Sequence, residues 1–157
     1  MRPHFTVLAP DCKTFLSGSE DHTVRVWNSA TGQCIRVCNG HIRSVESVAF
    51  APDGKTFLSG SYDDTIRVWN SATGQCCRIC KGHRDPVTSV AFAPDCKTFL
   101  SGSYDGTIRI WSAETGECLQ VIQNYPGLIV FGCDMRGLHE GSEIDKDVLR
   151  QYGAIVD

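Results

Sequence analysis

A spacing of 42 residues between tryptophans constrains this chain more than any other feature. Trp27, Trp69 and Trp111 follow one another at this interval, and the residues around them move with them. Residues 39–80 align without gaps on residues 81–122, with 26 of the 42 positions identical. Repetition at this period indicates a row of equivalent supersecondary units, each of which needs its neighbours to bury an apolar face.

Each repeat contains four short segments that are typical of β-strands. In the second repeat they are residues 47–52, 55–61, 65–69 and 76–80. They are rich in β-branched and aromatic residues, and Pro-Asp-Gly, Tyr-Asp-Asp and Thr-Gly turns separate them. Four strands in about 42 residues are typical of a propeller blade. We therefore predict an all-β chain of three four-stranded antiparallel blades, formed by residues 5–38 (a repeat clipped at its front), 39–80 and 81–122.

Two dipeptides connect these repeats to a known family. Gly40-His41 stands before Trp69 at the same interval at which Gly82-His83 stands before Trp111. This frame resembles the GH…WD signature of the WD-repeat (WD40) β-propeller family over residues 5–122. The final Asp of that signature is absent here, and its positions hold Asn28, Asn70 and Ser112. The resemblance implies WD40-type blades, either in a partial propeller or in one that a second chain completes.

A set of Ser, His and Asp residues recurs with the tryptophan and admits two interpretations. These residue types build hydrolase triads, so a serine hydrolase is a remote alternative. An active site is needed once, however, whereas this set is repeated. The resemblance implies a structural network in which Asp binds His, His binds Ser, and Ser binds the indole N–H. The sets are His41, Ser59, Asp63 and Trp69; His83, Ser101, Asp105 and Trp111; and, lacking a histidine, Ser17, Asp21 and Trp27. We therefore predict no enzyme, and a first blade that is the loosest.

The two full repeats differ mainly in one loop. Residues 47–60 and 89–102 differ at one position, whereas residues 42–46 and 84–88 differ at four of five. The resemblance places this loop and the second turn of each blade on the narrower top face of a propeller, where partners dock. We predict a protein-binding surface with two tyrosines as anchors; the alternative is loop drift, because nothing packs there. The predicted residues are Glu20, Ile42, Arg43, Ser44, Glu46, Tyr62, Asp64, Arg84, Asp85, Pro86, Thr88 and Tyr104.

Composition narrows the remaining function classes. The net charge of −3 argues against a nucleic-acid partner, and no segment is apolar enough to span a membrane. The nine cysteines mostly fall at repeat positions that another repeat fills with Gly or Ile, which favours reduced structural thiols over a metal or disulfide framework. We expect no metal and no cofactor. The lack of an apolar signal segment predicts a cytoplasmic protein.

Residues 123–157 break the repeat and are predicted to cap the last blade, with a helix near residues 143–152. This segment resembles the tails that close bacterial WD-repeat arrays, so a sensor fragment of a larger signalling NTPase is the alternative to a non-catalytic protein-interaction scaffold. Three blades leave two open sides, because propellers close with four to eight. Two solutions follow: a homo-oligomer of two chains in a six-bladed ring, or an open arc from a longer propeller.

Overall fold

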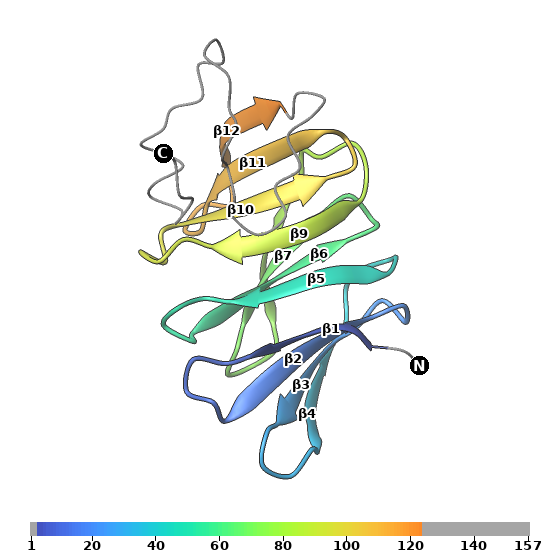
Figure 1. Ribbon diagram of the computed structural model, residues 1–157, viewed down its shortest axis with the longest axis vertical. Helices are drawn as coiled ribbons and strands as arrows, with labels where there is room; N and C mark the ends of the chain where they lie inside the picture. The colour runs from blue at the N-terminus through green and yellow to red at the C-terminus, as the bar shows by residue number, and fades with distance from the viewer. Residues whose placement is uncertain (1–2, 124–157) are drawn as a thin grey trace, which may run out of the picture. The chain divides into compact units, whose positions relative to one another are not determined.

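The computed structural model describes residues 3–123, which form three four-stranded antiparallel sheets (Figure 1). The strands are β1 (Pro3–Leu8), β2 (Thr14–Ser19), β3 (Val24–Asn28), β4 (Cys34–Cys38), β5 (Val45–Phe50), β6 (Thr56–Ser61), β7 (Ile66–Asn70), β8 (Cys76–Cys80), β9 (Val87–Phe92), β10 (Thr98–Ser103), β11 (Thr107–Ser112) and β12 (Cys118–Gln123). The prediction of an all-β chain with three such sheets is confirmed. The predicted helix near residues 143–152 lies outside the described residues.

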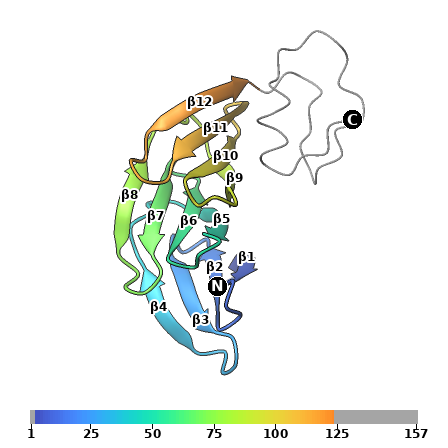
Figure 2. The ribbon, with the colours of Figure 1, turned by 90° about the vertical axis from the view of Figure 1, so that its left-hand side faces the viewer.

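In each sheet the strands are hydrogen-bonded in chain order, so consecutive strands are always neighbours. We call β1–β4 blade 1, β5–β8 blade 2 and β9–β12 blade 3. Figure 2 shows the blades side by side, with the first strands β1, β5 and β9 along one side and the last strands β4, β8 and β12 along the other. We call the first strand of each blade its inner strand and the last its outer strand. The loop that joins two blades therefore runs from the outer strand of one blade to the inner strand of the next.

The core lies between the blades, because alternation along each strand gives every sheet two different faces. The face that carries Phe57 and Trp69 in blade 2 is here called the front face; the two rings stack with centroids 6.0 Å apart. It packs against the rear face of blade 1, made of Leu16, Val24, Val26 and Cys38. Blade 3 repeats the arrangement: its Phe99 and Trp111 pack on the rear face of blade 2, made of Leu58, Ile66, Val68 and Cys80.

Close approach of the blades requires glycine at one rear-face position. A Cβ atom at Gly18 would lie 2.8 Å from Cγ1 of Val45, and one at Gly60 would lie 2.8 Å from Cγ1 of Val87. Real Cβ atoms do not approach another carbon so closely. The glycine thus allows the inner strand of the next blade to sit directly on the sheet.

The missing Asp of the family signature leaves no gap in the turn that follows the tryptophan. The Asn28 side-chain oxygen accepts hydrogen bonds from the amides of Ala30 and Thr31, both at 2.9 Å. Asn70 does the same in blade 2. An Asn amide oxygen supplies the acceptor that a carboxylate would offer, so the turn forms without the charge.

Two cysteines occupy a strained turn position. The φ angles of Cys12 and Cys96 are 59° and 58°, and the equivalent residue of blade 2 is Gly54 with a φ of 69°. Residues other than glycine lose roughly 1–2 kcal/mol in this left-handed conformation. Cys96→Gly and Cys12→Gly should therefore each raise the free energy of unfolding, by about 0.5–1 kcal/mol after the extra entropy of the unfolded chain is subtracted. Urea unfolding followed by tryptophan fluorescence measures the change.

The matched control is Cys77→Gly, because Cys77 is an exposed residue within β8. Glycine inside a strand destabilises by roughly 0.5–1 kcal/mol, so this variant should shift in the opposite direction. Equal effects at both kinds of position would contradict an origin in the backbone conformation.

Candidate interaction surface and the buried polar network

A chain of hydrogen bonds runs through the interior of blade 2. Trp69 Nε1 donates to Ser59 Oγ at 2.8 Å, and Ser59 Oγ lies 2.7 Å from His41 Nε2. His41 Nδ1 lies 2.8 Å from Oδ2 of Asp63. The same carboxylate accepts from the backbone N–H of Ile42 at 3.1 Å. The chain therefore connects the indole in the core to the loop that enters the blade.

Blade 3 repeats the chain with nearly the same distances. Trp111 Nε1 to Ser101 Oγ, Ser101 Oγ to His83 Nε2, and His83 Nδ1 to Asp105 Oδ2 measure 2.7, 2.7 and 2.8 Å. The backbone N–H of Arg84 donates to the carboxylate at 3.0 Å. The structure thus brings together every predicted member of the two complete networks.

Burial and hydrogen bonding act in opposition on the carboxylates. Burial by itself would raise the pKa of Asp63, but hydrogen bonds from His41 and Thr65 hold that pKa far below its usual range. Burial would also raise the pKa of Asp105. The hydrogen bonds from Thr107 and His83 outweigh it and hold this pKa far below its usual range. Burial lowers the pKa of His83 more than the neighbouring Asp105 raises it. In blade 3 the folded state therefore favours a neutral His83 imidazole beside an ionised Asp105 carboxylate.

This charge state assigns the protons along the network. A neutral imidazole whose Nδ1–H donates to the carboxylate presents Nε2 as an acceptor, so the serine hydroxyl donates to it. Ser59 and Ser101 also accept the indole N–H, and they are 0% and 1% exposed. No substrate can reach these hydroxyls in the folded state. The arrangement shares its atoms with a hydrolase triad but not the access to solvent that such a triad requires.

Blade 1 contains only part of the network. Trp27 Nε1 donates to Ser17 Oγ at 2.9 Å, as in the other blades. Asp21 instead forms an ion pair with Arg25 at 3.2 Å, and both side chains are partly exposed. Trp27 is partly buried, whereas Trp69 and Trp111 are each 1% exposed. That blade 1 is the loosest of the three remains a prediction.

Sequence reasoning missed an arginine that lies under each Gly-His pair. The Arg67 guanidinium carbon lies 6.0 Å from the centre of the Trp69 ring system. A Cβ atom at Gly40 would lie 2.6 Å from Nη1 of Arg67, so only glycine leaves room for the guanidinium. Gly82 has the same relation to Arg109. The signal was present in the sequence, since an arginine stands two positions before every repeat tryptophan.

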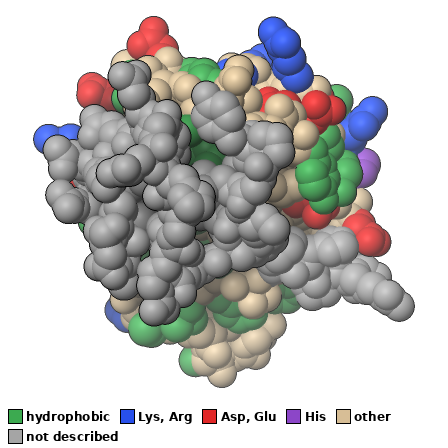
Figure 3. All heavy atoms as spheres, turned by 45° about the horizontal axis from the view of Figure 1, so that its top comes forward, with side chains coloured by type: hydrophobic (Ala, Val, Ile, Leu, Met, Phe, Trp, Pro, Cys, Tyr) green, Lys and Arg blue, Asp and Glu red, His purple; other side chains and the backbone are tan. Residues whose placement is uncertain are grey.

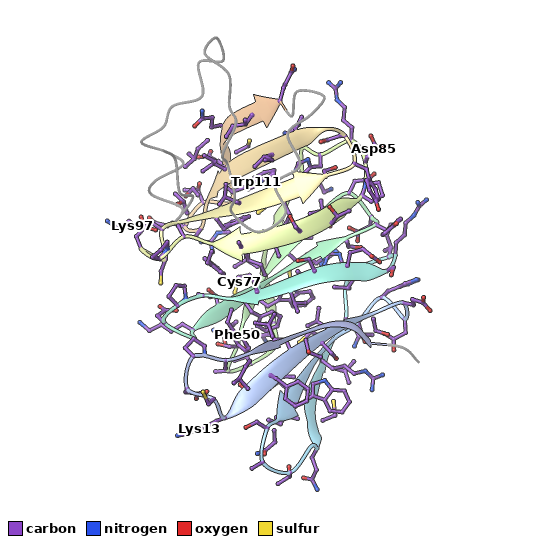
Figure 4. All side chains as sticks on the ribbon, in the orientation of Figure 1. Lys13, Phe50, Cys77, Asp85, Lys97 and Trp111 are labelled. Atoms are coloured by element: carbon purple, nitrogen blue, oxygen red, sulfur yellow. The ribbon has the colours of Figure 1, made fainter. Side chains whose placement is uncertain are left out.

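The predicted partner-binding residues lie at one end of the sheets, here called the top face: the loops of residues 39–44 and 81–86, the first two residues of β5 and β9 that follow them, and the turns of residues 20–22, 62–64 and 104–106. Figure 4 shows Asp85 at this end and Lys13 and Lys97 at the opposite end. Exposed members are Glu20, Ile42, Arg43, Arg84, Asp85 and Tyr104, and partly buried ones are Ser44, Glu46, Tyr62, Asp64, Pro86 and Thr88. Figure 3 shows hydrophobic side chains bordered by acidic and basic ones beyond the grey atoms.

Backbone hydrogen bonds hold the loops and turns of the top face together. The N–H of Tyr62 donates to the carbonyl of Ser44 at 2.9 Å, and the N–H of Tyr104 donates to that of Pro86 at 3.1 Å. The two tyrosine rings meet edge to face, with centroids 6.2 Å apart. Hydrogen bonding to Tyr104 raises the pKa of the Tyr62 phenol. The two predicted anchors thus form one aromatic pair that spans two blades.

The fold and the similarity to known protein families agree on the class of this protein: it is built from β-propeller blades. The family model of the WD domain, G-beta repeat (WD40), matches residues 5–28, 32–70 and 74–112. The chain therefore belongs to the WD40 repeat family, with three repeats. Repeats of this family are generally non-catalytic and typically bind proteins. Within residues 3–123, no helix is long and apolar enough to cross a membrane, and no cluster of His, Cys, Asp and Glu side chains could hold a metal ion.

Individual relatives match short stretches. The chain is 49% identical over 35 residues to the probable E3 ubiquitin ligase complex SCF subunit scon-2 of Neurospora crassa, and 50% identical over 34 residues to the human WD repeat-containing protein 86. Each match covers 22% of this chain, and 5% and 9% of those proteins. The solved structure of U3-55K superimposes with a TM-score of 0.76 at 24% identity, covering 79% of this chain and 40% of that one. At this identity the likeness shows the fold alone.

Removal of the serine should cost more in the blades that have a complete network. Ser59→Ala leaves the Trp69 indole N–H and Nε2 of His41 without a partner inside the core, which should lower the free energy of unfolding by about 1–3 kcal/mol. Ser17→Ala frees only the N–H of the partly buried Trp27, which water can bind, so about 0.5–1 kcal/mol is expected. Urea unfolding at one fixed protein concentration measures both. Equal losses would contradict the idea that the histidine adds to the network.

Stability should fall as the pH is lowered, in two stages. The folded-state pKa of His83 lies below its ordinary value, so its contribution is complete above about pH 6.5 and declines as the unfolded chain takes up the proton. The pKa values of Asp63 and Asp105 are also lowered, so a second loss begins below about pH 4. Urea midpoints across this range test both stages. His83→Gln should be less stable at neutral pH and should show a smaller first stage.

Proposed function

We propose that this chain is a non-catalytic scaffold that binds a protein partner through its top face. The observation that carries the proposal is the pair of Tyr62 and Tyr104, of which Tyr104 is 68% exposed although it is packed against another ring. Aromatic side chains with few rotatable bonds are the commonest anchors of protein interfaces. An aromatic pair that is accessible at Tyr104 and already ordered has little conformational entropy left to lose on binding.

The surroundings of the pair support a protein partner over other classes. The exposed side chains include Ile42, at 75%, with basic Arg43 and Arg84 and acidic Asp85. An apolar centre with charges of both signs around it is typical of protein interfaces, whereas a nucleic acid favours a continuous basic stripe. The chain carries a net charge of −3, which supports the same choice.

The frame under these side chains supports binding with little rearrangement. The carboxylates of Asp63 and Asp105 hold the backbone of residues 42 and 84, and the turn amides bond to loop carbonyls. Side chains on the loop can therefore vary between repeats without a change in the backbone. This arrangement suits a recognition surface, because specificity changes by substitution while the scaffold stays fixed.

A site-specific crosslink can identify the partner and locate its binding face. A photo-crosslinking amino acid at Arg84 of the full chain should form an adduct with a protein in cells, while the same amino acid at Lys97 should not. The purified adduct protein is then titrated against the wild-type chain and against the Tyr62→Ala/Tyr104→Ala variant. Loss of an anchor pair worth about 2 kcal/mol should raise Kd about 30-fold.

The matched control is Lys13→Ala/Lys97→Ala, which removes two exposed side chains from the opposite end and should leave Kd unchanged. Circular dichroism of both double variants checks that the blades remain folded. A Kd that does not change on removal of the tyrosines, or an adduct from Lys97 alone, would contradict binding at the top face.

A further inference from the structure

The end blades each present one face that no blade of residues 3–123 covers (Figure 2). The front face of blade 1 holds Phe15 and Trp27, which stack at 5.9 Å and are only partly buried. The equivalent phenylalanines and tryptophans of blades 2 and 3 are no more than 1% exposed. At the other end lies the rear face of blade 3, which consists of Leu100, Ile108 and Ile122, all partly buried, and of Ile110, which is 6% exposed.

These two faces are the halves of one contact that the chain already forms twice. The rear faces of blades 1 and 2 carry Leu, Val or Ile, Val and Cys at the positions that hold Leu100, Ile108, Ile110 and Ile122 in blade 3. Both of those rear faces pack against a stacked Phe–Trp pair. Phe15 and Trp27 are the one such pair among the described residues without a rear face against it. β1 has Thr6 where β5 has Val48, so this front face is the less apolar of the series.

Backbone space at both ends fits the same contact. Gly18 and Gly60 each leave room for an inner strand of the next blade. Gly102 occupies this position in blade 3, and among the described residues a Cβ atom there would meet Ser89 of its own blade. On the front side, Cβ atoms at Gly74 and Gly116 would lie 3.1 and 3.2 Å from a cysteine Sγ of the preceding blade.

The turn of blade 1 is free of such a neighbour. A Cβ atom at Gly32, the equivalent of Gly74 and Gly116, would have no atom of residues 3–123 within 4 Å. The outer turn of blade 1 thus keeps the shape that the other two turns use against a preceding blade. Both ends therefore retain features that serve a contact between blades 1 and 2 and between blades 2 and 3, and that meet no other blade of residues 3–123 at the ends.

We propose that the rear face of blade 3 in one chain packs on the front face of blade 1 in a second copy, and that the reciprocal contact closes two chains into six blades. A head-to-tail interface closes into a ring when its rotation fits, and six blades lie within the usual range of four to eight. A second copy covers both faces at once, because each face is the complement of the other. A cover of one face alone, such as the cap that the sequence predicts within residues 123–157, would leave the other face open.

The mass in solution of the wild-type chain and of two isoleucine variants tests the proposal. Light scattering on the full chain should give the mass of a dimer, which is twice the 17.2 kDa of one chain. Ile108→Lys places a charge on the rear face of blade 3 and should give the mass of a monomer. Ile79→Lys is the matched control: Ile79 is 46% exposed although blade 2 has a blade on either side, so this variant should remain a dimer. Near-UV circular dichroism verifies that both variants are folded.

A mixing experiment tests the head-to-tail direction. Thr6→Arg blocks the front face of blade 1 without removal of a packed group, since Thr6 is exposed, and this variant should also be a monomer. A mixture of Thr6→Arg and Ile108→Lys chains retains one intact front face and one intact rear face, so it should return to the dimer mass. A wild-type chain that is monomeric, or a mixture that remains monomeric, would overturn the proposal. A mass that grows beyond the dimer with concentration would overturn the closed ring.

Discussion

The rest of the structure depends on the packing of a stacked Phe–Trp pair against the aliphatic face of the preceding blade. Burial of these rings removes a large apolar surface from water, but it also carries an indole N–H into the core. That donor needs an acceptor, which Ser59 supplies in blade 2. The serine hydroxyl then needs an acceptor in His41, and the imidazole N–H needs one in Asp63. The polar network is thus a consequence of the hydrophobic contact.

The network also explains how a constant core supports a variable surface. Its last member, the carboxylate of Asp63 or Asp105, binds the backbone N–H of the residue after the histidine. The bond is made to the main chain, so it does not depend on whether the side chain is Ile42 or Arg84. The loop keeps one backbone course in both repeats while its exposed side chains differ. The structural role of the blade and the recognition role that we propose for its loop therefore use different atoms of the same residues.

The sequence was sufficient for the blades and for the members of the network, because gapless repetition identifies equivalent residues. It could not show which atoms meet. The contact of Arg67 with Gly40 joins a residue of β7 to the loop that enters its blade, 27 positions earlier in the chain, and no local pattern predicts it. The left-handed conformation of Cys96 could not be predicted from Cys96 itself, because cysteine does not favour it. Only Gly54, at the equivalent position of the second repeat, indicates it. The predicted cap within residues 123–157 lies largely outside the described residues.

Repetition of a head-to-tail contact has a consequence for the ends of the array. Each blade has one front face and one rear face, so however many blades are stacked, one face of each kind remains. Within residues 3–123 those faces hold the Trp27 ring at one end and Ile108 at the other, and neither side chain is fully buried. Extended exposed apolar faces favour association, so the physical alternatives are a cover at each end or closure onto each other. Closure needs no new chemistry, because each end already carries the surface that the other end is built to meet.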